Sequence, residues 1–130
     1  MSAYTTIRTE FNDLETLVNV LQQMGFPVET GHNLDLYDYL GVKRGKADLV
    51  IRRKHLLDVS NDLGFRRTGD VYKVIISDYD GAYLKKGNFL KELKQKYNVL
   101  KVKKETARQG LKLVREEVRT DGTVELVVTT

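Results

Sequence analysis

The 130-residue chain contains no cysteine, which excludes disulfide bonds, thiolate zinc sites, iron–sulfur clusters and cysteine nucleophiles together. No apolar run approaches the roughly 20 residues that a membrane-spanning helix needs. The first residues also lack the apolar stretch of a signal peptide. Because the absence of disulfides favours a reducing compartment, we expect a cytoplasmic protein with no membrane contact.

The sequence signatures of common catalytic and cofactor sites are missing as well. Neither G-x-x-x-x-G-K-[ST] nor G-x-G-x-x-G occurs, and no serine lies in a G-x-S-x-G turn. The only histidines, His32 and His55, lie far apart in loop-like sequence and do not suggest a zinc site. The sequence therefore predicts no metal, no cofactor and no catalysis. An enzyme with an unrecognised pair of carboxylates is our third hypothesis.

Charge is abundant but unevenly distributed. The chain has 22 basic and 18 acidic residues, a net charge of +4. Residues 1–41 hold one basic and six acidic residues, whereas residues 42–112 hold nineteen basic and eight acidic residues. Such a chain can bind an anionic partner through its middle, or its acidic and basic segments can face each other within the fold or across a dimer.

Apolar periodicity outlines the first elements. Residues 3–10 are rich in β-branched and aromatic residues and predict a strand. Residues 14–24 carry apolar side chains at helical spacing and predict a helix, which Asn12 or Asp13 would cap and Gly25 would end.

The middle of the chain predicts a loop followed by strands. Residues 27–30 predict a short strand. Residues 31–46 contain three glycines and no clean period, so we expect a long loop there. Residues 47–53 predict a strand, because they contain the short apolar run 49–51, which ends in two arginines. Residues 63–67 and 71–77 are strand-like on either side of Gly69, which predicts a β-hairpin.

The last third predicts two helices and a second hairpin. Asn88 can cap a helix over residues 89–97, and the β-branched residues that follow predict a break before a second short helix. Gly110 would end that helix. Residues 111–130 predict a hairpin that turns at Asp121 and Gly122.

The expected order of elements is thus β-α-β-β-β-β-α-α-β-β, with hairpins separating the helices. This order favours a single α+β domain over residues 1–130. We expect a mainly antiparallel β-sheet with two or three helices packed on one face.

Two surfaces are candidates for binding. Clustered cations predict a patch for an anion or a nucleic acid, with tyrosines 72, 79, 83 and 97 as candidates for stacking on bases. The cations of the patch are Lys43, Arg44, Lys46, Arg52, Arg53, Arg66 and Arg67. The last strand is apolar, and as an edge it would accept a strand of a partner or of a second copy through Val124, Leu126 and Val128. As a central strand it would simply be buried.

Several ordered patterns resemble one known family. They are "KADLVIR", "DLGFRRTGDVYKVI", "FLKELKQKY" and "ARQGLKLVREEVRTDGTVELVV", and the opening "TTIRTEFNDLETLVNVLQQMGF" fits as well. Together they are similar to the hypothetical chloroplast reading frame 35 family, whose members occur in cyanobacteria, some plastids and other bacteria. The resemblance implies a protein that is not secreted, and it implies no activity, cofactor or catalytic residue.

The leading hypothesis is a small non-catalytic accessory or adaptor protein that binds a partner protein or a second copy of itself. The alternative hypothesis is a nucleic-acid-binding module that uses the basic middle of the chain.

Overall fold

The computed structural model describes residues 4–7, 11–56, 61–77, 80, 88–118 and 124–129, and only the backbone of residues 4–7, 118, 124, 126 and 128. The elements, in chain order, are β1 (Tyr4–Ile7), α1 (Leu14–Gln23), β2 (Glu29–Tyr37), β3 (Lys43–Ile51), one turn of 3₁₀ helix η1 (Arg53–His55), β4 (Leu63–Thr68), β5 (Val71–Ser77), α3 (Phe89–Arg108), β6 (Lys112–Val118) and β7 (Val124–Thr129).

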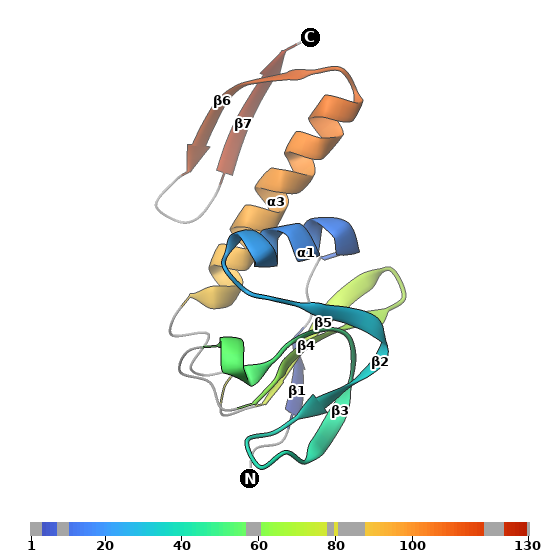
Figure 1. Cartoon of the computed structure of the whole chain (residues 1–130). Helices are drawn as coiled ribbons and strands as arrows, with labels where there is room; N and C mark the ends of the chain where they lie inside the picture. The colour runs from blue at the N-terminus through green and yellow to red at the C-terminus, as the bar shows by residue number, and fades with distance from the viewer. Residues whose placement is uncertain are drawn as a thin grey trace.

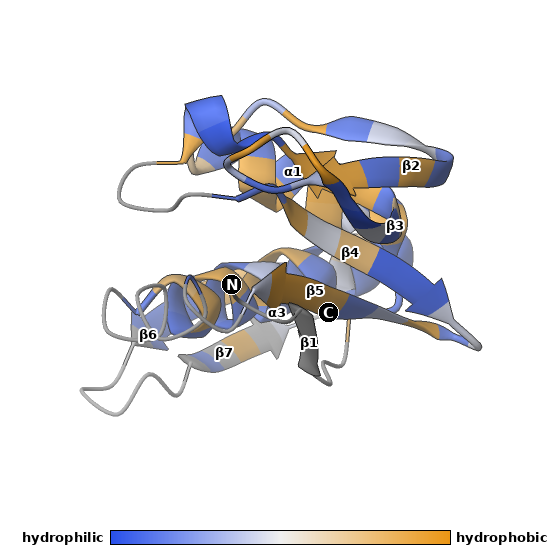
Figure 2. Ribbon diagram, turned by 90° about the horizontal axis from the view of Figure 1, so that it is seen from below, coloured by the Kyte–Doolittle hydropathy of each residue, from blue (hydrophilic) through white to orange (hydrophobic). Residues whose placement is uncertain are grey.

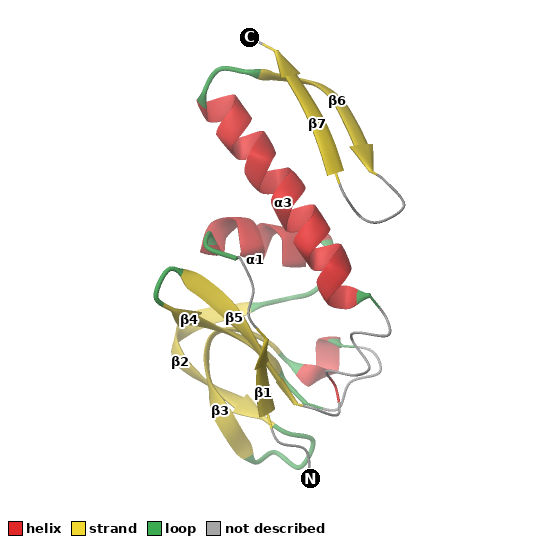
Figure 3. Cartoon of the chain, turned by 180° about the vertical axis from the view of Figure 1, so that it is seen from behind, coloured by secondary structure: helices red, strands yellow, loops and turns green. Residues whose placement is uncertain are grey.

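The strands form two separate antiparallel sheets. A five-stranded sheet has the order β1-β5-β4-β3-β2, and β6 and β7 form a two-stranded sheet of their own. Helices α1 and α3 lie on one side of the larger sheet, and α3 extends beyond it to the β6–β7 hairpin (Figures 1 and 3). The predicted α+β architecture, an antiparallel sheet with helices on one face, is therefore confirmed.

The main core lies between the larger sheet and the helices. Cross-strand register aligns Leu49 of β3 with Phe65 of β4, and Phe65 with Val74 of β5, so each strand contributes to one buried row. Leu17 and Leu21 of α1 are fully buried in the same cluster. Burial of each such side chain contributes about 1.5–3 kcal/mol, which makes this layer the main source of stability.

The start of α1 is tied to α3 by polar contacts. Asp13 is the N-cap, as predicted, and its Oδ1 accepts a hydrogen bond from the Thr16 amide at 3.3 Å. The buried Tyr97 hydroxyl of α3 accepts from the amides of Asn12 and Asp13 at 3.0 and 2.9 Å. Lys104 of α3 forms an ion pair with Asp13 at 3.1 Å. These contacts fix where α3 crosses α1.

A smaller core lies on the other face of the sheet. Leu36 of β2, together with Ala47 and Val50 of β3, is buried there, and Ile75 of β5 packs against this cluster. The cluster needs Gly64 of β4, because a Cβ atom at this residue would lie 2.8 Å from the Ala47 Cβ and 2.9 Å from Leu36 Cδ2. The missing side chain of Gly64 allows Leu36 and Ala47 to approach the sheet closely.

Two predictions about secondary structure are wrong. The loop expected over residues 31–46 is largely the β2–β3 hairpin. A register shift between Thr30 and Leu34, with Asn33 at a φ of 55°, breaks the alternation that normally identifies a strand.

The break expected after residue 97 does not exist either, because α3 is one helix of 20 residues. Tyr97 is buried in the main core and Leu100 packs against it, so burial on both sides of Val99 outweighs the weak helix propensity of a β-branched residue. Gly110 does follow the helix, with a φ of 74°. Both predicted hairpins are present, but Asp121 and Gly122 lie outside the described residues.

The hydropathy of the ribbon follows the layers. Figure 2 shows the apolar colour along β5 and the hydrophilic colour at the end of β4, where Arg66 and Arg67 lie. None of the helices in the described part of the chain is long and apolar enough to cross a bilayer.

Candidate functional site: the turn between β2 and β3

The predicted basic patch separates into two groups. Lys43, Arg44 and Lys46 of β3 form ion pairs with acidic residues of β2 and of the turn that follows it. Two more cations, Arg52 and Arg53, donate hydrogen bonds to carbonyl oxygens in the same region. These five cations belong to one neighbourhood.

Arg66 and Arg67 form the other group, at the end of β4. The Arg67 amide donates to Asp48 at 2.7 Å, and the Arg67 side chain donates to the Gly69 carbonyl at 3.2 Å. Arg66 lies opposite Lys73 of β5 and is exposed.

Most cations of the first group pair with the acidic segment that precedes them. Arg52 pairs with Glu29 at 2.7 Å, Arg44 with Asp38 at 2.8 Å, and Lys43 with Asp35 at 3.6 Å. Lys46 contacts Asp35 as well. The acidic and basic segments therefore face each other within the fold, which is one of the two arrangements of charge that the sequence allowed.

The ion pairs shift the acids toward their charged forms. The hydrogen bond from Arg44, followed by that from the Val42 amide, lowers the pKa of Asp38 from its ordinary 3.8. The hydrogen bond from Lys46 likewise lowers the pKa of Asp35, and that from Arg52 lowers the pKa of Glu29. Arg52 gains most from Glu29, and its pKa is raised in spite of partial burial.

Asp38 organises a short turn, residues 38–42, which we call the β2–β3 tip. Its carboxylate is buried and accepts from the amides of Leu40 and Val42 at 2.9 and 3.0 Å. Its own amide donates to the Val42 carbonyl, and the Gly41 amide donates to the Asp38 carbonyl, both at 2.9 Å. Gly41 has a φ of 78°, a conformation that glycine adopts at no steric cost.

Residues beneath the tip hold its remaining backbone groups. The Tyr39 amide donates to Asn61 Oδ1 at 2.9 Å, and Arg53 donates to the Tyr39 carbonyl at 3.2 Å. Asn61 is itself fixed by Asp80, which accepts from its amide at 3.0 Å and from its side chain at 2.8 Å. Every amide from residue 38 to 42 therefore has a partner, and the tip has a fixed backbone.

A second buried acid anchors the strands below the tip. Asp62 is 2% exposed, and its Oδ2 accepts from the Tyr37 amide at 2.9 Å and from Arg52 at 2.7 Å. Its Oδ1 accepts from the Arg53 amide at 2.9 Å. Asp38, Asp62 and Asp80 thus all bind backbone amides or neighbouring side chains, which is a structural use of carboxylates. No group of three potential metal ligands occurs among the described residues.

The side chains of the tip are apolar and exposed. Tyr39 is 52% exposed, Leu40 66% and Val42 46%. The tip lies at the lower end of Figure 1, at the opposite end of the molecule from the β6–β7 hairpin. Sequence reasoning missed this site because it treated the whole of residues 31–46 as a loop. An aspartate followed by Tyr-Leu-Gly was the available signal for a capped turn.

Two of the tyrosines suggested as base-stacking platforms do not have that role. Tyr72 is 7% exposed and Tyr97 is 1% exposed, and both belong to the main core. The prediction is therefore wrong for these two, whereas residues 79 and 83 lie outside the described residues.

The candidate edge residues Val124, Leu126 and Val128 lie in β7. Their backbones pair with Val118, Glu116 and Leu113 of β6, and β7 has no other neighbour among the described strands. The interpretation as a central strand is wrong, because β7 is an edge in the described part of the chain.

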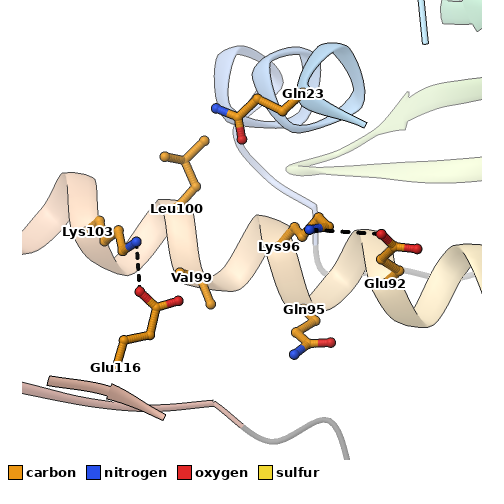
Figure 4. A pocket seen from close by; sticks show the side chains of 8 residues that line it. All are labelled: Gln23, Glu92, Gln95, Lys96, Val99, Leu100, Lys103 and Glu116. Atoms are coloured by element: carbon orange, nitrogen blue, oxygen red, sulfur yellow. Dashed lines mark ion pairs between the residues drawn. The ribbon is translucent and has the colours of Figure 1, made fainter. Parts of the chain in front are cut away.

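An open pocket of about 530 Å³ lies where α1, α3 and β6 meet (Figure 4). Val99 and Leu100 form its apolar part, and Gln23 enters from α1. The ion pair between Lys103 and Glu116, at 2.8 Å, joins α3 to the hairpin beside it. This lining is largely polar and contains no buried titratable group, so it has no arrangement typical of an active site.

Comparison with known proteins gives one match. No curated protein and no solved structure is similar to the chain at a significant level. A family model described as "Protein of unknown function (DUF1257)" matches residues 20–127, which include every described element except β1, the start of α1 and the end of β7. The chain therefore belongs to the DUF1257 family of proteins of unknown function.

Proposed function

We propose that this protein is a non-catalytic accessory protein that binds a partner protein through the β2–β3 tip. The observation that carries the proposal is the combination of a fixed backbone with exposed side chains. Residues 38–42 have all their amides bonded, yet Tyr39, Leu40 and Val42 all face solvent.

A rigid apolar tip is well suited to binding. Association normally requires the ordering of loops and side chains, and a backbone that is already fixed avoids most of that entropic cost. Tyrosine beside a leucine is the kind of anchor that dominates protein interfaces when it enters a pocket of the partner. Asn61 and Arg53 supply the support that such an anchor requires, because both form hydrogen bonds with the backbone of Tyr39.

The charge around the tip indicates the chemistry of the partner. Lys43 follows the tip directly and its side chain is 66% exposed, while Arg53 and Lys54 are exposed beneath it. The acid inside the tip, Asp38, is buried and paired with Arg44. The exposed rim is therefore cationic, and it fits a partner whose apolar pocket has an acidic rim.

A nucleic-acid-binding function is the second candidate, because one cationic cluster, Arg66 and Lys73, is not among the cations that pair with the acids of β2. Arg66 and Lys73 are cross-strand neighbours, an arrangement that is unfavourable unless an anion lies nearby. No ion pair of either side chain occurs within the described residues. This cluster is small, however, and the stacking residues Tyr72 and Tyr97 are buried. These facts favour the protein partner.

The remaining interpretations follow from the same observations. We infer a cytoplasmic location and a relationship to the hypothetical chloroplast reading frame 35 proteins, both from the sequence patterns. The third hypothesis, an enzyme with a carboxylate pair, is less favoured because Asp38, Asp62 and Asp80 bind structural partners.

The proposal can be tested by comparative affinity capture. Wild-type protein and the Leu40→Ser variant are used as baits in an extract of the native host, with and without nuclease. Val102→Ser is the matched control, because Val102 is an exposed apolar residue of α3 far along the chain from the tip. A captured protein is then purified and its affinity for each variant is measured by calorimetry.

We expect a partner that survives nuclease and binds Leu40→Ser about thirtyfold more weakly, a typical loss for an interface anchor. Val102→Ser should bind like the wild type. Equal binding by all three proteins would exclude the tip. Capture that disappears with nuclease, together with binding to an oligonucleotide that weakens steeply with salt, would support the second candidate.

A further inference from the structure

The β6–β7 hairpin is a sheet of only two strands. Among the strands that the structure describes, β6 and β7 pair only with each other. A hairpin of this kind is marginally stable by itself in water. Each of its strands also has an outer edge of backbone groups that can accept another strand.

The two edges of the hairpin differ in how well they are protected. Strand β6 has four charged residues in "KLVREEV", and a register shift between Leu113 and Arg115 leaves Val114 unmatched as a bulge. Charges and bulges are the features by which natural edge strands avoid pairing. The ion pair between the hairpin and α3, from Lys103 to Glu116, is also made by β6.

Strand β7 lacks such protection. Its sequence, "VELVVT", has a single charged residue, Glu125, and that residue pairs with Arg115 of β6 at 3.3 Å. It contains no proline and no glycine, and its pairing with β6 has no extra residue on the β7 side. An edge of this composition is a template for strand addition.

We propose that the outer edge of β7 pairs antiparallel with β7 of a second copy of the chain, so that two hairpins form one sheet across a two-fold axis. The charge of the strand favours a copy of itself. Any register that pairs more than half of β7 with its copy places Glu125 opposite an uncharged residue rather than opposite the second Glu125. Glu125 is the one charge that β7 offers to a charged peptide, and that carboxylate already pairs with Arg115 of β6.

The symmetry of this contact also limits the assembly. Two β7 edges related by a two-fold axis use the same surface on both subunits, so the contact closes at a dimer. The outer edges of the resulting sheet are the two β6 strands, which are the protected ones. The arrangement therefore removes the unprotected edge without creating a new one.

The test compares two equivalent substitutions in the full chain by analytical ultracentrifugation. Val127→Glu adds a carboxylate to β7 opposite Arg115, its cross-strand neighbour, so the hairpin tolerates it. Across the two-fold axis the same change brings like charges together. Val114→Glu is the matched control, because it makes the same change at the bulge of β6.

We expect the wild type to form a dimer whose dissociation constant rises about tenfold or more in Val127→Glu. The constant should change less than about twofold in Val114→Glu. A monomer at every accessible concentration would overturn the proposal. Loss of the dimer in Val114→Glu but not in Val127→Glu would also overturn it, because the contact would then lie at β6.

A cross-linking measurement keeps the test decisive if Val127→Glu folds poorly, which circular dichroism reports. The chain has no cysteine, so a single introduced cysteine reports its own contacts. We expect at least one of Leu126→Cys, Val127→Cys and Val128→Cys to form a disulfide-linked dimer, and Leu113→Cys on β6 to stay monomeric. Cross-linking of Leu113→Cys alone would contradict the proposed pairing.

Discussion

The β2–β3 tip and the β6–β7 hairpin both expose apolar side chains, but they are supported in different ways. The tip is held by buried acids and by amides that are all bonded. The hairpin is held by its own ladder and by limited contacts with α3, which include the ion pair between Lys103 and Glu116. Apolar exposure on a fixed turn is typical of a docking anchor, whereas apolar exposure on a lightly held hairpin is typical of a surface that another strand completes.

Removing the buried acid Asp62 beneath the tip should have the largest effect on stability, and it tests whether the tip depends on its buried support. Asp62→Ala removes the acceptor of the Tyr37 and Arg53 amides and leaves the half-buried Arg52 without one of its two acidic partners. We expect the free energy of unfolding to fall by about 3 kcal/mol, measured by urea denaturation. Asp70→Ala in the exposed β4–β5 turn is the control and should change it by less than about 0.5 kcal/mol. A small loss in Asp62→Ala would show that the tip does not depend on this acid.

A side chain at Gly64, where Leu36 and Ala47 lie close to the backbone, should cause the next largest loss of stability. Gly64→Ala would place its Cβ 2.8 Å from the Ala47 Cβ, so the smaller core must move. We expect a loss of about 2 kcal/mol in the free energy of unfolding. Gly45→Ala is the matched control, because its Cβ would lie 3.6 Å from the nearest Leu36 atom, an ordinary contact. Equal losses in both variants would mean that the two glycines act only through chain entropy.

The ion pairs of the tip predict a dependence on pH. The folded pKa of Asp38 lies below its ordinary 3.8, so its contribution is complete above about pH 4 and is lost as the pH falls through the lower folded value. The free energy of unfolding should therefore fall in acid, and it should fall less steeply in Asp38→Asn. Thermal denaturation between about pH 6 and pH 2 measures both slopes. An equal dependence on pH in the wild type and in Asp38→Asn would show that Asp38 does not cause the loss of stability in acid.

The contact between the hairpin and α3 should have the smallest effect. Lys103 and Glu116 are both partly exposed, and such pairs contribute about 0.5 kcal/mol. We expect Glu116→Gln to lower the free energy of unfolding by about that amount, and a double-mutant cycle with Lys103→Met isolates the pair. A coupling as large as the Asp62 effect would remove the contrast between the two regions.

The parts of the fold that follow from local sequence patterns could be predicted. The helix capped by Asp13 and the hairpin around Gly69 depend on residues close in the chain, and both are present. The hairpin of β2 and β3 could not be predicted, because the register shift near Asn33 hides its alternation. The continuity of α3 depends on the burial of Tyr97 and Leu100 on either side of Val99, which no local pattern reveals.

The candidate site was predicted only in part. The sequence singled out Lys43, Arg44 and Arg52, and these cations do lie together. It could not show that they face the acids of β2, because that pairing depends on the strand register. It also could not show that Tyr39 and Leu40 are exposed on a turn whose support, Asn61, is remote in sequence.

The unbroken α3 also sets the distance between the five-stranded sheet and the β6–β7 hairpin. A helix of 20 residues is about 30 Å long, and the middle of α3 is locked to α1 through Tyr97. Its first half packs on the main core through Phe89 and Leu93, and its other end leads to the β6–β7 hairpin, so it separates the five-stranded sheet from the hairpin (Figure 1). In a dimer joined at β7, two such helices would carry the tips to opposite ends of the assembly. A partner with repeated sites could then engage both tips at once, and the high effective concentration of the second tip would strengthen binding without any new contact.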